Sequence, residues 1–150
     1  MKGGIEMLAT TSKVIACIVN GHLQIEPIQL SRCHRVRVDV TPEFEVKNTS
    51  TEIINIIISS NKVIIPSLRK EIQCTNEVLY VENNSNSLVF YIRASNVKDA
   101  IGKAMTCVKT DYDKESQAFR NTKSNSHAIT ANKLVRLYNG LQLQYKGVNA

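Results

Sequence analysis

Few side chains in this sequence could act as a histidine base in nucleophilic catalysis. That chemistry needs a nucleophile, a base and a group that orients the base. The histidines available as bases are His22, His34 and His127. Cys33 and His34 are adjacent, but they lie in a strand-like run where neighbouring side chains point to opposite faces. We therefore expect one to point inward and the other outward, and we predict neither a catalytic dyad nor an enzymatic function.

A zinc site would draw on two pairs of residues in the first quarter of the chain. Structural zinc usually takes pairs of Cys or His that are two to four residues apart. Cys17 and His22 straddle the turn dipeptide Asn20-Gly21, which suits one pair. The other pair, Cys33 and His34, is adjacent rather than spaced. The spacing therefore does not favour a zinc site.

The acidic residues Asp111, Asp113 and Glu115 resemble the opening of a calcium loop. Such a loop requires Gly at its sixth position and Glu at its twelfth. Ser116 and Thr122 occupy these positions here. The same trio could hold magnesium against a phosphorylated substrate, but the chain has no Gly-rich phosphate-binding motif. We predict no metal site and no cofactor.

Positive charge gathers in the last third of the chain. The 150 residues include 19 Lys and Arg against 13 Asp and Glu, a net charge of +6, and no acidic residue follows Glu115. This asymmetry suggests contact with nucleic acid, an acidic protein face or anionic lipid, although a solvated surface that keeps the protein soluble is a slightly better explanation. The residues best suited to contact nucleic acid or an acidic partner are Arg120, Lys123, Asn132, Lys133 and Arg136.

The first two thirds of the chain have the patterns of β-strands. Residues 34–40 alternate strictly and place three valines on one face. Residues 53–58 include five isoleucines, which is typical of a strand covered on both faces. Two β-prone runs, 77–82 and 87–94, flank the turn-forming residues 83–86. This last pattern predicts a β-hairpin.

Two helices are predicted in the C-terminal third. Asn96 can cap a helix over 97–108, with Asp99 in a weaker version of the capping box, and Gly102 suggests close packing on the sheet. A second helix is predicted over 128–139, with Gly140 where helices commonly end. Residues 141–145 alternate and could form a final strand. Residues 111–126 are polar and aperiodic, which indicates a loop or arm.

These patterns predict an α+β fold. We expect a mainly antiparallel β-sheet or sandwich over residues ~13–94, with helices over ~97–108 and ~128–139. A chain of 150 residues suggests one domain, 1–150, with a polar arm at 110–127. Its apolar runs are too short for a membrane span or a signal peptide. We therefore expect a cytoplasmic protein, or one incorporated in a particle.

The function class that these observations favour is a non-enzymatic structural or assembly subunit. Strands 53–58, 77–81 and 88–92 are apolar on both faces, and such faces must be covered by helices or by neighbouring copies. We expect oligomerisation through them, as in a virus- or phage-like particle or a secretion machine, with copies of itself or other assembly subunits as partners. The alternative is a small basic regulatory protein that binds nucleic acid through its C-terminal helix face.

Overall fold

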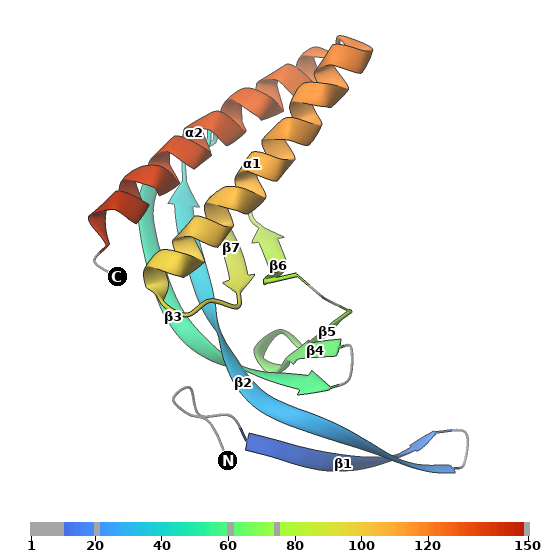
Figure 1. Ribbon diagram of the computed structural model, residues 1–150. Helices are drawn as coiled ribbons and strands as arrows, with labels where there is room; N and C mark the ends of the chain where they lie inside the picture. The colour runs from blue at the N-terminus through green and yellow to red at the C-terminus, as the bar shows by residue number, and fades with distance from the viewer. Residues whose placement is uncertain (1–10, 20–21, 60–61, 74–75, 149–150) are drawn as a thin grey trace.

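The chain folds into a β-sheet followed by two long helices (Figure 1). The computed structural model describes residues 11–19, 22–59, 62–73 and 76–148, with side chains from Ile28 onward. The strands are β1 (Thr11–Val19), β2 (His22–Val40), β3 (Val46–Ser59), β4 (Lys62–Ile65), β5 (Lys70–Gln73), β6 (Val78–Asn83) and β7 (Ser87–Ile92). A 3-10 turn, η1 (Pro66–Leu68), separates β4 from β5, and the helices are α1 (Val97–Thr122) and α2 (Asn125–Gly147). The predicted α+β class is confirmed.

The strands form one antiparallel sheet built on β2, which is 19 residues long. Their order is β5-β4-β3-β2-β7-β6, and β1 pairs with the first half of β2. β3 runs along one side of β2 from Ile28 to Val40, and β7 pairs with residues 34–39 on the other side. The predicted hairpin is confirmed as β6 and β7, which leaves β6 at one end of the strand order.

Helix α1 begins where the sequence predicts but runs well beyond the predicted end. The Asn96 side chain accepts a hydrogen bond from the Asp99 amide (2.8 Å), and the Asp99 carboxylate accepts one from the Ser95 amide (3.0 Å). The helix ends at Thr122, and the capping residue Lys123, with a left-handed backbone (φ 57°), donates its amide hydrogen to the Phe119 carbonyl. The expected polar arm at 110–127 is therefore wrong. Its residues lie mostly in α1 and at the start of α2.

Helix α2 continues through Gly140, so the predicted helix end at this residue and the predicted strand over 141–145 are both wrong. A Cβ at Gly140 would lie 2.7 Å from the Cβ of Val46, so glycine here permits close approach to β3 rather than ending the helix. A Cβ at Gly102 would lie 3.3 Å from the Tyr145 ring of α2. The prediction that Gly102 packs closely on the sheet is therefore wrong, because this residue packs against α2.

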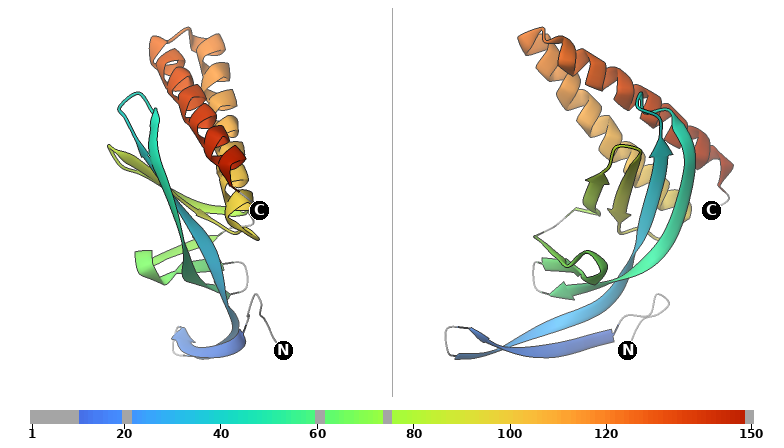
Figure 2. Two further views of the ribbon diagram at one scale, coloured as in Figure 1. Left: turned by 90° about the vertical axis from the view of Figure 1, so that its left-hand side faces the viewer. Right: turned by 180° about the vertical axis from the view of Figure 1, so that it is seen from behind.

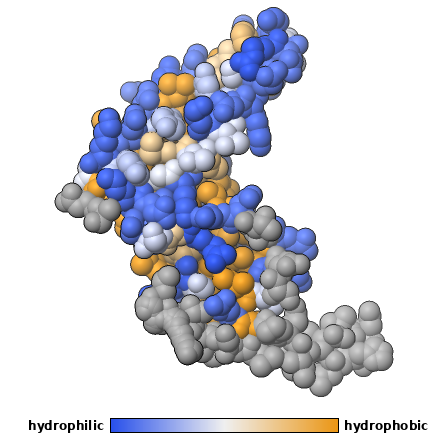
Figure 3. All heavy atoms as spheres, in the orientation of Figure 1, coloured by the Kyte–Doolittle hydropathy of each residue, from blue (hydrophilic) through white to orange (hydrophobic). Residues whose placement is uncertain are grey.

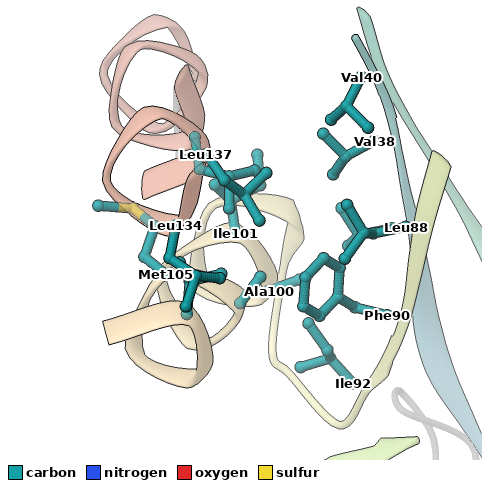
Figure 4. Close-up of a cluster of buried hydrophobic side chains, with 14 residues drawn as sticks. Val38, Val40, Leu88, Phe90, Ile92, Ala100, Ile101, Met105, Leu134 and Leu137 are labelled. Atoms are coloured by element: carbon teal, nitrogen blue, oxygen red, sulfur yellow. The ribbon is translucent and has the colours of Figure 1, made fainter. Parts of the chain in front are cut away.

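Two apolar clusters lie on opposite faces of the sheet. Figure 4 shows side chains of β2 and β7 pointing toward those of α1 and α2. This helix-side cluster consists of Val36, Val38, Val40, Leu88, Phe90, Ile92, Ala100, Ile101, Ala104, Met105, Val108, Leu134, Leu137 and Leu141. The far-side cluster consists of Cys33, Ile56, Val63, Ile65, Leu79, Val89 and Tyr91. Because β7 supplies both clusters, all six of its residues are buried.

The sheet curls around the far-side cluster. Its long central strands bend strongly (Figure 2), as expected of twisted strands of this length. Leu68 of η1 and Ile72 of β5 pack on this cluster, and so does Tyr80 of β6. The ammonium group of Lys70 lies 4.8 Å from the centroid of the Tyr80 ring. The curl therefore brings β5 toward the far face of β6, while the helices cover the other face.

Candidate interaction site

The five basic and amide side chains predicted to contact a partner are not gathered into one patch. Arg120 lies near the end of α1 and donates hydrogen bonds to Ser116 and Gln117. Lys123 sits in the turn between the helices. Asn132, Lys133 and Arg136 lie on α2, so Lys133 is ten residues, or about 15 Å, further along that helix from the turn.

The two cations on α2 are engaged with the turn between β2 and β3. The ammonium group of Lys133 lies 5.8 Å from the centroid of the Phe44 ring. The Arg136 guanidinium donates to the backbone carbonyl of Glu43 (3.4 Å). Two exposed carboxylates, Glu43 and Glu45, belong to the same turn. This neighbourhood weakens the positive field that a nucleic-acid contact would need.

Cys33 and His34 point to opposite faces of β2, as predicted. Cys33 belongs to the far-side cluster, and His34 pairs with Ile92 of the helix-side cluster. The expectation that one points outward is wrong, because both residues are buried. Burial raises the pKa of the Cys33 thiol to about 11, against the smaller lowering effects of a backbone hydrogen bond at Ile92 and of Arg93. The thiol is therefore protonated and a poor nucleophile at neutral pH.

The residues considered as metal ligands do not share a site. Asp111, Asp113 and Glu115 lie within α1 rather than in a loop, where Asp113 pairs with Lys109 and Glu115 with His127. Within the described ranges, no group of three or more His, Cys, Asp or Glu side chains could hold a metal ion. The side chains of Cys17 and His22 lie outside the described residues.

A groove lies between β6 and α1. It encloses about 710 Å³, which is within the range of ligand-binding clefts. Its floor comes from 78–81 of β6, and Lys103, Thr106, Cys107 and Thr110 line it from α1. Figure 3 shows apolar surface below α1, over the region of β6 and β7, beside the hydrophilic outer surface of the helices.

The groove forms because the second half of α1 extends away from the sheet and because β6 is the last strand in the sheet order. The buried residues of α1 stop at Val108, although the helix runs 14 residues further. In the strand order, β6 has a neighbour only on the β7 side among the described strands. Edge strands present unpaired backbone N–H and C=O groups along their open side. The groove therefore combines an open strand edge with an apolar floor.

The charge of Lys103, which lines the groove from α1, is compensated within the chain. Lys103 forms ion pairs with Glu77 and with Asp99 (3.1 Å), and it also donates to the Arg93 carbonyl (2.9 Å). Burial and then Asp111 raise the pKa of the Cys107 thiol, against an opposing effect of Lys114. The thiol is therefore neutral and acts as a small apolar group. The apolar floor from β6 suits a partly apolar segment.

Sequence reasoning found half of this site. The apolar character of 77–81 is evident from the sequence. Lys103, Thr106 and Cys107 lie in the predicted helix, but Thr110, Asp111 and Lys114 fell in the predicted polar arm at 110–127, so their contribution was missed. A usable signal is the spacing of Lys103, Thr106, Thr110 and Lys114, which puts them on one face of a continuous helix.

No described helix is long and apolar enough to cross a bilayer. Comparisons with protein-family models, curated proteins and solved structures give no match.

Proposed function

We propose that the protein is a non-enzymatic assembly subunit that pairs with a second copy of itself through the edge of β6. The observation that supports this proposal is the open edge of an apolar strand beside a groove of about 710 Å³. Half-buried Val78 and Val81 face that groove in a strand that has no charged residue before Glu82. Exposed, flat, apolar edges pair with other strands unless they are blocked by charge, proline or a cover.

A second β6 is a chemically suitable occupant. Two copies related by a two-fold axis would pair antiparallel, since an isologous contact uses the same surface on both subunits. A register centred on Tyr80 sets Glu77 opposite Asn83 and Glu82 opposite Val78. Like charges are therefore not opposed, which would be unfavourable in directly facing positions. Each α1 would then lie over the strand of the other copy.

Binding of nucleic acid through α2 is the second candidate. It is favoured by the absence of acidic residues from α2 and by the exposure of Asn132 and Arg136. It predicts binding that weakens with salt and is lost when Lys133 and Arg136 are both changed to Glu. The engagement of both cations with the β2–β3 turn makes this candidate weaker than strand pairing.

The test is size exclusion with light scattering at tens of micromolar protein, with absorbance at 260 nm followed alongside. We expect a dimer free of nucleic acid for the wild type. Val81→Lys, which sets a charge in the middle of the edge, and Thr106→Arg, which fills the groove from an exposed position of α1, should both give monomers. Gln73→Lys, on the other terminal strand β5, is the matched control and should remain dimeric.

A monomeric wild type would contradict the proposal, and so would dimers of both groove variants. Val81 is half-buried, so circular dichroism must show that Val81→Lys is folded. Thr106→Arg provides the test without touching the core, because Thr106 is exposed. A species that carries nucleic acid at low salt and releases it at high salt would favour the second candidate instead.

A further inference from the structure

Exposed aliphatic side chains are concentrated on the outer face of α2. Four large aliphatic residues are exposed among the described residues, and three of them belong to this helix: Ile129 (56 %), Val135 and Leu143 (70 %). Single exposed apolar residues are normal, but several on one element indicate a surface that another chain covers. The left view of Figure 2 shows α2 in front of α1, with no described element over it. These side chains are therefore accessible to a partner.

The exposed positions of α2 form a stripe along the helix, and the opposite side of the helix is buried against the rest of the chain. Alternating steps of three and four residues separate the members of this stripe, which are Ile129, Asn132, Arg136, Asn139, Leu143 and Lys146. Val135 lies next to Arg136 at the side of the stripe. Steps of three and four are the spacing through which two helices pack side by side. The stripe therefore has the geometry to receive a second helix.

The charged residues of this stripe are all basic. Helix α2 contains no Asp or Glu, and Arg136 and Lys146 are both exposed. The Arg136 guanidinium donates to a backbone carbonyl, that of Glu43, and neither cation forms an ion pair with a carboxylate in the described part of the chain. The surface of α1 differs, because Lys109 is paired there with Asp113. The outer face of α2 therefore complements negative charge.

The combination of aliphatic and basic side chains restricts the kind of partner. Nucleic acid is bound mainly through cations at its phosphates, and it would leave Ile129 and Leu143 without a role. A second α2 would bring cations against cations, which is unfavourable in a protein interface. An amphipathic helix with carboxylates beside its apolar side chains matches both kinds of residue.

We propose that the outer face of α2 binds an acidic amphipathic helix of a partner protein. The apolar side chains of that helix pack against Ile129, Val135 and Leu143, and its carboxylates pair with Arg136 and Lys146. No residue of α2 lines the groove beside β6. The contact is therefore separate from the pairing of β6 edges, and a dimer would present two such faces.

Calorimetric titration of the full-length protein with two synthetic peptides tests this proposal. Both peptides have three heptads with Leu at the a and d positions, and the e and g positions are Glu in one peptide and Lys in the other. Like charges at e and g oppose the pairing of either peptide with itself. We expect saturable binding of the Glu peptide at micromolar concentration and at least about tenfold weaker binding of the Lys peptide.

Variants of α2 separate the apolar and the charged parts of the contact. Ile129→Gln and Leu143→Gln should each weaken binding of the Glu peptide about tenfold, because each removes an aliphatic side chain that the peptide covers. Lys146→Glu should weaken it as well, because it sets a carboxylate against the carboxylates of the peptide. Ile53→Gln, on β3, is the matched control and should bind as the wild type does, since Ile53 is the exposed aliphatic residue that lies outside α2.

Three results would overturn the proposal: no saturable binding of the Glu peptide, equal affinity for the Lys peptide, or unchanged affinity in Leu143→Gln. Binding of a DNA duplex that is lost in Arg136→Glu but kept in Leu143→Gln would overturn it in favour of nucleic acid. A dimer that is lost in Leu143→Gln but kept in Thr106→Arg would overturn it in favour of a second copy of the chain.

Discussion

The two strands of one hairpin, β7 and β6, are similarly apolar but differ in how the fold covers them. All six residues of β7 are buried, because it lies between β2 and β6 and has an apolar cluster on each face. In β6 only Leu79 is buried, while Val78, Tyr80 and Val81 are partly exposed. Strand composition therefore sets the tendency to form a sheet, and position within the sheet sets exposure.

This difference identifies β6 as the strand of the hairpin that the fold leaves partly uncovered. An apolar strand that is central in the sheet contributes to folding, whereas an apolar strand at the edge leaves surface for another chain. The charged side chains on the far face of β2, Arg35 and Arg37, are paired with Glu52 and Asp39. These arginines therefore have partners within the chain, while β6 has an open edge among the described strands.

The largest expected effect separates Phe90 of β7 from its cross-strand neighbour Val81 of β6. Phe90 is 2 % exposed within the helix-side cluster, so Phe90→Ala should lower the free energy of unfolding by about 3–5 kcal/mol. Val81→Ala removes less buried surface and should cost about 1 kcal/mol. Urea denaturation of both variants measures the difference. Equal costs would mean that β6 is as fully covered as β7.

A smaller effect on stability is expected at two helical glycines. Gly140 is tightly packed against β3, whereas Gly102 lies beside a tyrosine ring that can move. Gly140→Ala would press against Val46 and should destabilise the protein by about 1–3 kcal/mol. Gly102→Ala meets only the edge of the Tyr145 ring, so its gain in helix propensity, about 1 kcal/mol, should be largely retained.

Thermal unfolding of these glycine variants, with the double variant Gly140→Ala and Val46→Ala, checks this expectation. The second substitution should recover part of the loss by removing the Cγ2 methyl group of Val46, the atom nearest to the new Cβ. If Gly140→Ala were neutral on its own, the close contact between α2 and β3 would not limit packing there.

The smallest expected effect compares the two tyrosines of the hairpin. The Tyr91 hydroxyl accepts a hydrogen bond from Arg35 Nε (3.1 Å), and Tyr91 is 1 % exposed. Tyr91→Phe should therefore cost about 0.5–1.5 kcal/mol. Tyr80→Phe is the control and should be neutral, because no partner of the Tyr80 hydroxyl occurs among the described residues. Chemical denaturation measures the free energy of unfolding of both variants. A larger loss for Tyr80→Phe than for Tyr91→Phe would mean that β6 is more fully covered than β7.

The sequence predicts best those features that are determined locally. The β6–β7 hairpin follows from four turn-forming residues between two β-prone runs. The start of α1 follows from Asn96 and Asp99, which make the hydrogen bonds expected of a cap. The strict alternation of 34–40 likewise predicts the burial of Val36, Val38 and Val40. Each of these signals acts within a few residues of the chain.

Features that depend on distant partners could not be predicted. The second half of α1 packs against α2 rather than the sheet, so its apolar stripe is too narrow to identify a helix. Glycine is required at position 140 by the close contact with Val46, about a hundred residues earlier in the chain, and no local pattern reveals this contact. The apolar strand 77–81 was identified, but its place at the edge of the sheet depends on the whole strand order. The sequence therefore predicted the apolar strand of the candidate groove but not its open edge.

Amide hydrogen exchange of β6 at several protein concentrations tests the pairing of its edge most directly. Backbone amides of β6 that point away from β7 should be protected at tens of micromolar and should exchange faster on dilution and in Thr106→Arg. The amides of β7 should stay protected throughout, because their partners lie within the chain. Exchange of the outward β6 amides that is fast and independent of concentration would contradict the account.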